Sequence, residues 1–326
     1  MDSKLTEDKT TSIEDQTGWW NSIASADFDQ DGDMDYVAGN LGWNNNFQVT
    51  PSTPLKVFAK DFDGNGSIDP IMACYMRASM NDPEKKLFPV HFWDEINSQS
   101  PLFRRKFRKY REYGKATMAQ LLSPAELKDA LVLEANNLSS SIIENIGNGK
   151  FKMKALETKI QVAPVNGIVV ADFNDDSFPD IAMVGNDYGN EVFAGRYDAF
   201  TGIILLGDGK GNFALDPSAK NGFYVPGDAK GLVQLNHPKG RMLIATQNQD
   251  SLKVFNYRLP SKTFSPKPLD FSGEIIFENG KKQKIEFNYG SGFLSQSSRS
   301  LVIPKGVKEI IVTDFQGNKR TVQPNP

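Results

Sequence analysis

DFDQDGDMDYVAGN, residues 27–40, places an aspartate at every second position from 27 to 35 and then becomes apolar. Two further stretches repeat the pattern, DFDGNGSID at 61–69 and DFNDDSFPD at 172–180. Each has oxygen-bearing side chains at positions 1, 3, 5 and 9, with Gly32, Gly66 or Ser177 at position 6. Oxygens at this spacing suit a hard cation that takes about six to eight of them, and glycine permits the sharp turn that gathers them.

Position 7 of the three loops is chemically mixed, so its backbone carbonyl is the expected ligand there. Calcium fits such loops better than magnesium, which demands stricter octahedral geometry. The sequence therefore predicts about three Ca²⁺ sites, one in each loop. The predicted ligand residues are Asp27, Asp29, Asp31, Asp33, Asp35, Asp61, Asp63, Asn65, Ser67, Asp69, Asp172, Asn174, Asp176, Phe178 and Asp180.

Two simpler explanations compete with this prediction. An EF-hand would close its loop with glutamate at position 12, but that position is Ala38, Met72 or Met183 within an apolar run. The short apolar segments on both sides indicate strand–loop–strand units instead. Asp and Asn also form ordinary turns. One nine-residue pattern in three loops, with carboxylates that repel one another unless a cation is bound, favours metal binding over turn formation.

Composition narrows the functional class. The chain has 326 residues, of which 39% are hydrophobic and 24% charged, as in ordinary globular proteins. Its net charge of −3 argues against a general nucleic-acid partner. With only Cys74, no internal disulfide can form. No apolar run is long enough to span a membrane, and the first 20 residues lack the apolar segment of a signal peptide.

The three loops and their flanking strands resemble FG-GAP/VCBS repeats, the calcium-loop blades of integrin-type β-propellers. IIENIGNGKF and ILLGDGKGNF resemble the outer-strand hairpins of the same family. A unit at 231–257 keeps two apolar strands but lacks the carboxylates, so a metal-free blade is expected there. The resemblance implies a mainly β fold of about four propeller-type blades, in a partial or open propeller, over residues 1–260.

The remaining residues, 265–326, resemble the ASPIC/UnbV segment that follows such propellers in extracellular proteins. The matching features are GSGFLSQSS and the strand–turn–strand KEIIVTDFQGNKRTV. They predict a small C-terminal β-domain. Together the two resemblances imply an extracytoplasmic location: secreted, periplasmic or at the cell surface. Because integrin-type propellers have seven blades, we expect the chain to be the C-terminal part of a longer secreted protein whose N-terminal blades are missing. A four-bladed or partial ring is the alternative.

An insertion at about 75–140 separates the second loop from the third, and its pattern is helical. Phe103, Phe107 and Tyr110 share one face of a predicted basic helix at 102–113. A second helix is expected to begin at Ser123, with Pro124 and the capping partner Glu126. The basic helix favours a solvated surface element over a site for an anionic glycan, lipid headgroup or nucleic acid.

The sequence shows no catalytic constellation. His91 and His237 are the only histidines and lie in dissimilar contexts, and Cys74 lies in an apolar run where a thiol is normally inert. We therefore expect a non-enzymatic calcium-binding propeller module for extracytoplasmic recognition or adhesion, with a protein or glycan partner. The alternatives are a propeller enzyme that acts on polysaccharide, as a lyase or glycosidase, and a structural fragment of a longer secreted protein.

Overall fold

The computed structural model describes residues 6–192, 194–237, 240–257, 262–292 and 295–324. The chain divides into two compact units. Unit 1 comprises residues 1–15, 20–45 and 139–326, and unit 2 comprises residues 16–19 and 46–138. Both are built mainly from antiparallel sheets, which confirms the predicted β class. No helix in the described ranges is long and apolar enough to cross a lipid bilayer.

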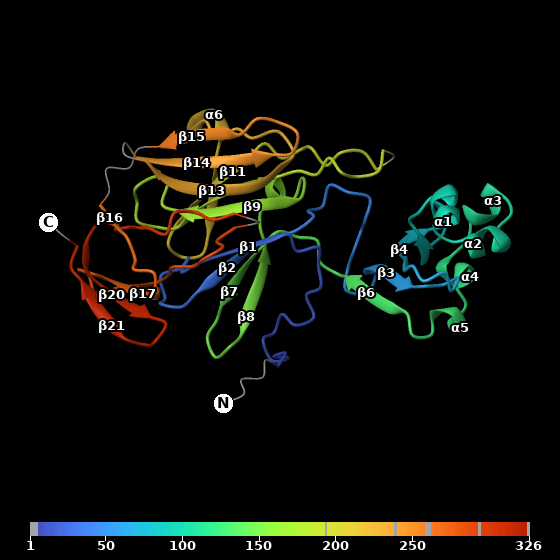
Figure 1. Ribbon diagram of the computed structural model, residues 1–326, viewed down its shortest axis with the longest axis horizontal. Coiled ribbons are helices and arrows are strands. Elements are labelled where there is room, and N and C mark those ends of the chain that lie inside the picture. Colours follow the sequence, from blue (N-terminus) through green and yellow to red (C-terminus); the bar gives the residue numbers. More distant parts are fainter. Residues whose placement is uncertain (1–5, 193, 238–239, 258–261, 293–294, 325–326) are drawn as a thin grey trace. The chain divides into compact units, whose positions relative to one another are not determined.

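Three antiparallel sheets of unit 1 are formed by residues that precede 258 (Figure 1). The first has the order β1-β2-β7-β8: Ser22–Ala26, Asp35–Gly39, Ser141–Asn145 and Phe151–Ala155. The second is β9 to β12: Val165–Ala171, Asp180–Gly185, Ile203–Gly207 and Phe213–Asp216. The third is β13 to β15: Ala229–His237, Gly240–Gln247 and Lys253–Tyr257. Between them lie the 3₁₀ helix η1 (Thr158–Ile160) and α6 (Ser218–Asn221).

The second sheet is buried on both faces, and β10 shows why its sequence is continuously apolar. Successive side chains of a strand point to opposite faces. Ile181 and Met183 pack in a cluster shared with the first sheet, whereas Ala182 and Val184 pack in a cluster shared with the third. Both faces thus need apolar residues, and the run IAMVG satisfies that requirement.

The first strands of the three sheets lie side by side, because β9 contacts both β1 and β13. Side-by-side first strands are the arrangement expected of neighbouring propeller blades. No closed ring of sheets is seen in the described part of the chain. The propeller and its number of blades therefore stay predictions.

The C-terminal residues of unit 1 form a further sheet of order β18-β17-β20-β21. Its strands are Lys282–Glu286, Asp270–Phe277, Val307–Asp314 and Lys319–Val322. A short pair, β16 (Thr263–Phe264) with β19 (Leu301–Val302), lies beside its apolar cluster. Ile275, Ile310 and Val312 are the fully buried residues of that cluster.

Unit 2 is a four-stranded sheet with five short helices. The sheet order is β5-β4-β3-β6: Lys85–Pro89, Asp69–Arg77, Leu55–Lys60 and Leu131–Ala135. The helices α1 to α5 are Trp93–Gln99, Pro101–Lys106, Tyr110–Tyr113, Met118–Leu121 and Pro124–Leu127. Ile71 of β4, Ile96 of α1 and Phe103 of α2 form one apolar cluster with Leu121 of α4.

Unit 2 interrupts a sheet of unit 1. β2 pairs directly with β7, so that Val37 lies opposite Ile142, and all of residues 46–138 fall within that one connection. The sequence placed an insertion at about 75–140 between blades and assigned the second acidic loop to a blade of its own. In the structure, that loop and the helices belong to the same inserted unit. Local patterns identify strands but not their partners, which explains the difference.

The basic segment at 102–113 is two helices rather than one. Phe107 and Lys109 have extended backbone angles and separate α2 from α3. Trp93 donates its ring N–H to the carbonyl of Phe107 at 3.1 Å, and the rings of Phe107 and Tyr113 meet edge to face. These tertiary contacts override the helical pattern. The capping box at Ser123 is confirmed, although α5 ends at Leu127.

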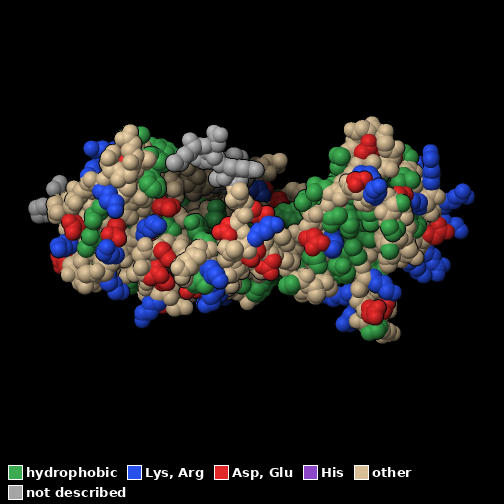
Figure 2. Space-filling view, turned by 90° about the horizontal axis from the view of Figure 1, so that it is seen from below, with side chains coloured by type: hydrophobic (Ala, Val, Ile, Leu, Met, Phe, Trp, Pro, Cys, Tyr) green, Lys and Arg blue, Asp and Glu red, His purple; other side chains and the backbone are tan. Residues whose placement is uncertain are grey.

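The aromatic and basic residues of this segment differ in burial. Phe103 is fully buried, whereas Arg104, Arg105, Arg108 and Lys109 are exposed. Figure 2 shows Lys and Arg side chains standing out from the helical part of unit 2. Lys106 is the exception, because its ammonium donates to the carbonyl of Leu121 at 2.6 Å and pairs with Glu126 at 2.7 Å.

Burial predicts opposite outcomes for neighbouring substitutions in α2. Phe103→Ala should lower the free energy of unfolding by about 3–5 kcal/mol, because it removes a large ring from a closed cluster. Arg104→Ser, the matched control, should change it by less than about 0.5 kcal/mol. Denaturant unfolding of both variants measures this difference. Equal losses would show that the basic face is also packed.

Candidate metal centres

Each acidic loop joins two antiparallel strands in the same register. The loops connect β1 to β2, β3 to β4, and β9 to β10. In each hairpin, the residue before position 1 lies opposite the aspartate at position 9. These three pairs are Ala26–Asp35, Lys60–Asp69 and Ala171–Asp180. In all three hairpins, the loop therefore leaves the first strand and enters the second at the same paired position.

The first loop is held by hydrogen bonds from backbone N–H groups to its own carboxylates. Phe28 donates to Asp35 at 3.1 Å, and Gly32 donates to Asp27 at 3.2 Å. The N–H of Asp31 lies 3.2 Å from a carboxylate oxygen of both Asp27 and Asp29. These bonds draw positions 1, 3 and 9 towards one centre.

The other two loops repeat this pattern atom for atom. In the second loop, Phe62 donates to Asp69 at 3.0 Å and Gly66 donates to Asp61 at 2.8 Å. In the third, Phe173 donates to Asp180 at 2.8 Å and Ser177 donates to Asp172 at 2.8 Å. Asn65 and Asp176 donate to positions 1 and 3 as Asp31 does. Loops of different sequence thus adopt one conformation.

That conformation needs two left-handed residues, at positions 4 and 6. Position 6 has φ of 98° at Gly32, 89° at Gly66 and 74° at Ser177, so the serine adopts a backbone that glycine adopts freely. Position 4 is also left-handed in all three loops, with φ of 60° at Gln30, 75° at Gly64 and 65° at Asp175. The sequence pattern predicts this requirement only for position 6. Glycine and aspartate tolerate left-handed backbone angles, so Gly64 and Asp175 were the signal in the sequence for the same requirement at position 4.

Two groups of carboxylates converge closely enough to hold a metal ion. Oxygens of Asp27, Asp29 and Asp35 all lie within 4.8 Å of one another, and so do oxygens of Asp61, Asp63 and Asp69. Two oxygens that each bind calcium at about 2.4 Å lie at most about 4.8 Å apart. Both groups can therefore contribute three ligands to one cation.

The third loop presents a different set of donors. Its position 3 is Asn174, whose amide nitrogen donates to Asp176 at 2.8 Å. It therefore offers fewer carboxylates to a cation than the first loop. Of the other predicted ligands, Asp31, Asn65 and Asp176 each accept the backbone N–H of position 7. Asp33 has a buried carboxylate oxygen without a hydrogen-bond partner among the described residues.

Burial makes the ionised form of several of these aspartates unfavourable. Asp27, Asp35 and Asp180 are exposed by only 1%, 3% and 0%. Desolvation raises the pKa of Asp27 to about 6 and the pKa values of Asp35 and Asp180 to about 7. Desolvation also raises the pKa values of Asp29, Asp33, Asp69 and Asp172. A bound cation would favour the ionised form and reverse these shifts.

The second loop is the most exposed of the three. There, the backbone N–H of Gly66 is the main cause that lowers the pKa of Asp61. The turn that begins at Asp314 serves as a comparison, because its aspartate is not buried. Asp314 accepts the N–H groups of Gln316 and Asn318, both at 2.9 Å, and the hydrogen bond from the Asn318 side chain leads the causes that lower its pKa. The first and third loops differ from such a turn because their carboxylates are buried together.

The other candidate residues have structural surroundings. His91 accepts the N–H of Met72 at 3.0 Å through Nε2, and Tyr113 donates its hydroxyl to the His91 carbonyl at 2.7 Å. Cys74 is buried, and burial raises the pKa of its thiol. His237 ends β13. These positions favour packing roles.

Comparison of the sequence with protein-family models and with curated proteins gave no match. The resemblance to FG-GAP/VCBS repeats and to the ASPIC/UnbV segment therefore rests on the motifs quoted above. The loop geometry is a separate observation, which comes from the structure alone.

Removal of one ligand should reduce the stabilising effect of calcium. At a hundredfold excess of calcium over Kd, each site should add about 2.7 kcal/mol to the free energy of unfolding. Asp29→Ala removes a converging carboxylate from the first loop and should narrow the difference between melting temperatures with calcium and with chelator. Asn174→Ala should narrow it less, because it removes a neutral ligand. Asp314→Ala, in the ordinary turn described above, is the control and should leave the difference unchanged. Equal melting temperatures in calcium and chelator would contradict the metal sites.

The raised pKa values predict an unusual pH dependence for metal-free protein. Asp27, Asp35 and Asp180 have higher pKa values when folded than when unfolded, so their contribution to stability is complete below about pH 4 and is lost as pH rises through about 7. Calcium binds the ionised form, so its stabilisation should grow over the same interval. Melting of metal-stripped protein at pH 5 and pH 8, without and with calcium, measures both effects. An equal calcium shift at the two pH values would disprove the linkage.

Proposed function

We propose that this chain is a calcium-stabilised β-propeller-type module that recognises a partner outside the cytoplasm and does not catalyse a reaction. The observation that carries the calcium part is the common geometry of the three loops. Each places oxygen donors from positions 1 and 9 at the end of a hairpin, and two of them gather three carboxylates within 4.8 Å. Calcium suits these sites because it accepts six to eight oxygens in flexible geometry.

A structural role for the cation follows from where the loops lie. Without a cation, buried like charges would oppose the pairing of the strands that each loop joins. A bound cation would cancel this repulsion and hold the two strands in register. This role needs no exchange of the metal during function, and it fits a module that works where calcium is abundant. Extracellular calcium modules bind at about 10⁻⁴–10⁻³ M.

The arrangement of sheets supports the propeller and recognition parts of the proposal. β1, β9 and β13 lie side by side, as the first strands of neighbouring blades would. The motif resemblance to FG-GAP/VCBS repeats and the ASPIC/UnbV segment supports the extracytoplasmic location. The alternative function, a propeller enzyme acting on polysaccharide, would need a pair of carboxylates in a cleft. The paired carboxylates described above all belong to the loops, so we prefer recognition.

Calorimetric titration of metal-stripped protein with calcium tests the proposal. We expect about three sites, with tightest binding at the first loop because it carries most carboxylates. Loss of one site in Asp29→Ala, with the other sites retained, would assign that site. A flat titration up to millimolar calcium would refute calcium binding. Cleavage of a polysaccharide by the calcium-loaded protein would favour the enzyme instead.

A further inference from the structure

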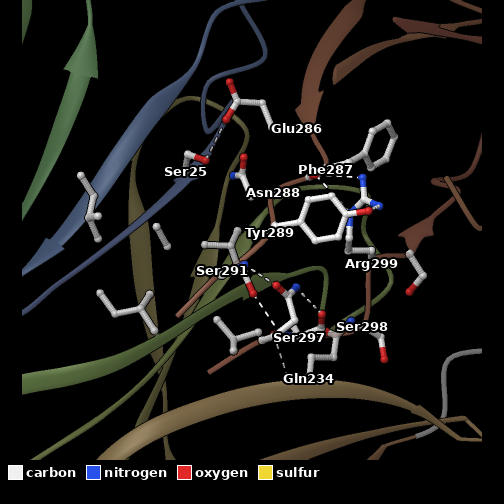
Figure 3. A pocket seen from close by; sticks show the side chains of 18 of the residues that line it. Ser25, Gln234, Glu286, Phe287, Asn288, Tyr289, Ser291, Ser297, Ser298 and Arg299 are labelled. Carbon is white, nitrogen blue, oxygen red and sulfur yellow. Dashed lines mark hydrogen bonds between the residues drawn. The ribbon is translucent and has the colours of Figure 1, made fainter. Parts of the chain in front are cut away.

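A cavity of about 430 Å³ lies within unit 1, beside the strands that flank the first acidic loop, and none of the predicted calcium ligands lines it (Figure 3). Its floor is formed by β1, β9 and β13, the three adjacent first strands. Its wall is formed by residues 286–291 and 296–300, two stretches of one segment of the chain. This segment contains most of the GSGFLSQSS motif, which the calcium sites do not explain. The volume lies within the range of small-molecule pockets.

The wall is fixed to the floor by hydrogen bonds along β13. The N–H of Gln234 donates to the Ser297 hydroxyl at 3.0 Å, and the N–H of Ser298 donates to the Gln234 carbonyl at 2.8 Å. Asn236 donates to the Ser298 hydroxyl at 3.1 Å. Within the wall, the N–H of Ser297 donates to the Ser291 hydroxyl at 3.0 Å. Hydrogen bonds to serines of the motif therefore hold the cavity in shape without a ligand.

Most polar groups around the cavity are neutral. Hydroxyl and amide side chains line it, and such groups can both donate and accept hydrogen bonds. Among them are Ser25, Gln234, Asn288, Ser291, Gln296 and Ser297. A lining of this kind matches a ligand that presents many hydroxyl groups of its own.

Two charged residues line the cavity, Glu286 and Arg299, and they differ in how far the protein already occupies their hydrogen-bonding groups. Arg299 is engaged by the protein: it donates to the carbonyls of Asp270 at 2.6 Å and Phe287 at 3.1 Å, and to the Tyr289 hydroxyl at 2.6 Å. Glu286 accepts the Ser25 hydroxyl at 3.4 Å. The cavity thus lacks a guanidinium directed at a ligand anion but has a carboxylate, which suits a pair of hydroxyl donors.

An aromatic ring and apolar strand residues complete the surroundings. Tyr289 is 60% exposed, although the guanidinium of Arg299 covers one face of its ring at 3.9 Å from the ring centre and its hydroxyl donates to the Pro268 carbonyl at 3.0 Å. Ile23 of β1 is also 60% exposed, and Ile168 and Val170 of β9 line the floor. An exposed ring beside neutral polar groups can stack on the C–H face of a sugar while the hydroxyl groups of the sugar meet the polar wall.

We propose that this cavity binds a neutral saccharide. The proposal rests on the recognition function proposed above and names the ligand class of that function. An anionic ligand would meet the carboxylate of Glu286, and among the described lining residues the cation, Arg299, is already engaged by the protein. A protein partner would require a far larger surface than this concave site provides. Hydroxyl groups, amides, one carboxylate and one exposed ring together fit a neutral pyranose best.

Binding of simple sugars to the whole calcium-loaded chain tests the proposal. The probes are methyl glycosides of glucose, galactose, mannose and N-acetylglucosamine, with glucuronate and glucosamine as charged counterparts. We expect at least one neutral glycoside to bind with Kd of about 1 mM or tighter, measured by calorimetry or ligand-observed NMR. No binding of any neutral probe at about 10 mM, or preference for either charged probe, would overturn the proposal.

Variants locate the site. Tyr289→Ala should weaken binding about tenfold or more by removing the stacking ring, and Tyr289→Phe should retain most affinity. Glu286→Gln should weaken binding about tenfold without removing any packing. Tyr224→Ala and Glu278→Gln, at exposed positions elsewhere in unit 1, are matched controls and should bind as the unaltered chain does. Unchanged affinity in both Tyr289→Ala and Glu286→Gln would place binding outside this cavity and refute the assignment.

The same titrations separate this proposal from the calcium proposal. Calcium binding without sugar binding refutes the saccharide site and leaves the metal sites intact. Sugar binding by a chain that shows no calcium sites supports the cavity and refutes the metal sites. The melting temperature of each variant, measured alongside, shows whether lost affinity reflects a lost contact or a lost fold. Glu286→Gln keeps the test decisive if Tyr289→Ala does not fold.

Discussion

The burial of carboxylates at the ends of the acidic loops sets the main constraint on this structure. Asp27 and Asp35 stand at the two ends of one loop, nearly inaccessible to water, and the backbone donors of the loop hold them in place. Desolvation disfavours the ionised form of both carboxyl groups and raises the pKa of Asp27 to about 6 and that of Asp35 to about 7. Folding brings them together because the apolar strands on either side must pair, with Val37 at the centre of their core. The calcium ion proposed for this loop would favour the ionised carboxylates and so reconcile their burial with the pairing of the strands.

Residues of the first and third acidic loops also contact the C-terminal part of unit 1. Lys284 of β18 donates its N–H to Asp27 at 2.8 Å. On the third loop, Lys305 pairs with Asp175 at 2.5 Å and donates its N–H to the Ser177 hydroxyl at 3.2 Å. The wall of the cavity continues from β18, at Glu286. The two lysines that contact the acidic loops thus lie on either side of the wall residues in the sequence.

Local features of the fold could be predicted from the sequence, because local residues determine them. The strands around each loop, the apolar run of β10 and the cap at Ser123 all follow from neighbouring residues. The pairing of β2 with β7 could not be predicted, since about a hundred residues separate the partners. The helix break at Phe107 depends on Trp93, and the cavity depends on strands from three sheets. Such contacts have no signature in a short window of sequence.

The place of unit 2 in the chain has a consequence for folding during synthesis. Its first and last strands are neighbours, with Leu55 opposite Ala135, so the folded unit returns the chain close to the point where it left. Once unit 2 has formed, the long connection from β2 to β7 behaves as a short loop, and its closure costs far less entropy. During synthesis, the strands of unit 2, β3 to β6, all emerge before β7. Unit 2 can therefore fold before β7 is available to pair with β2. Early folding of unit 2 would thus bring β2 and β7 close together in space and favour their pairing.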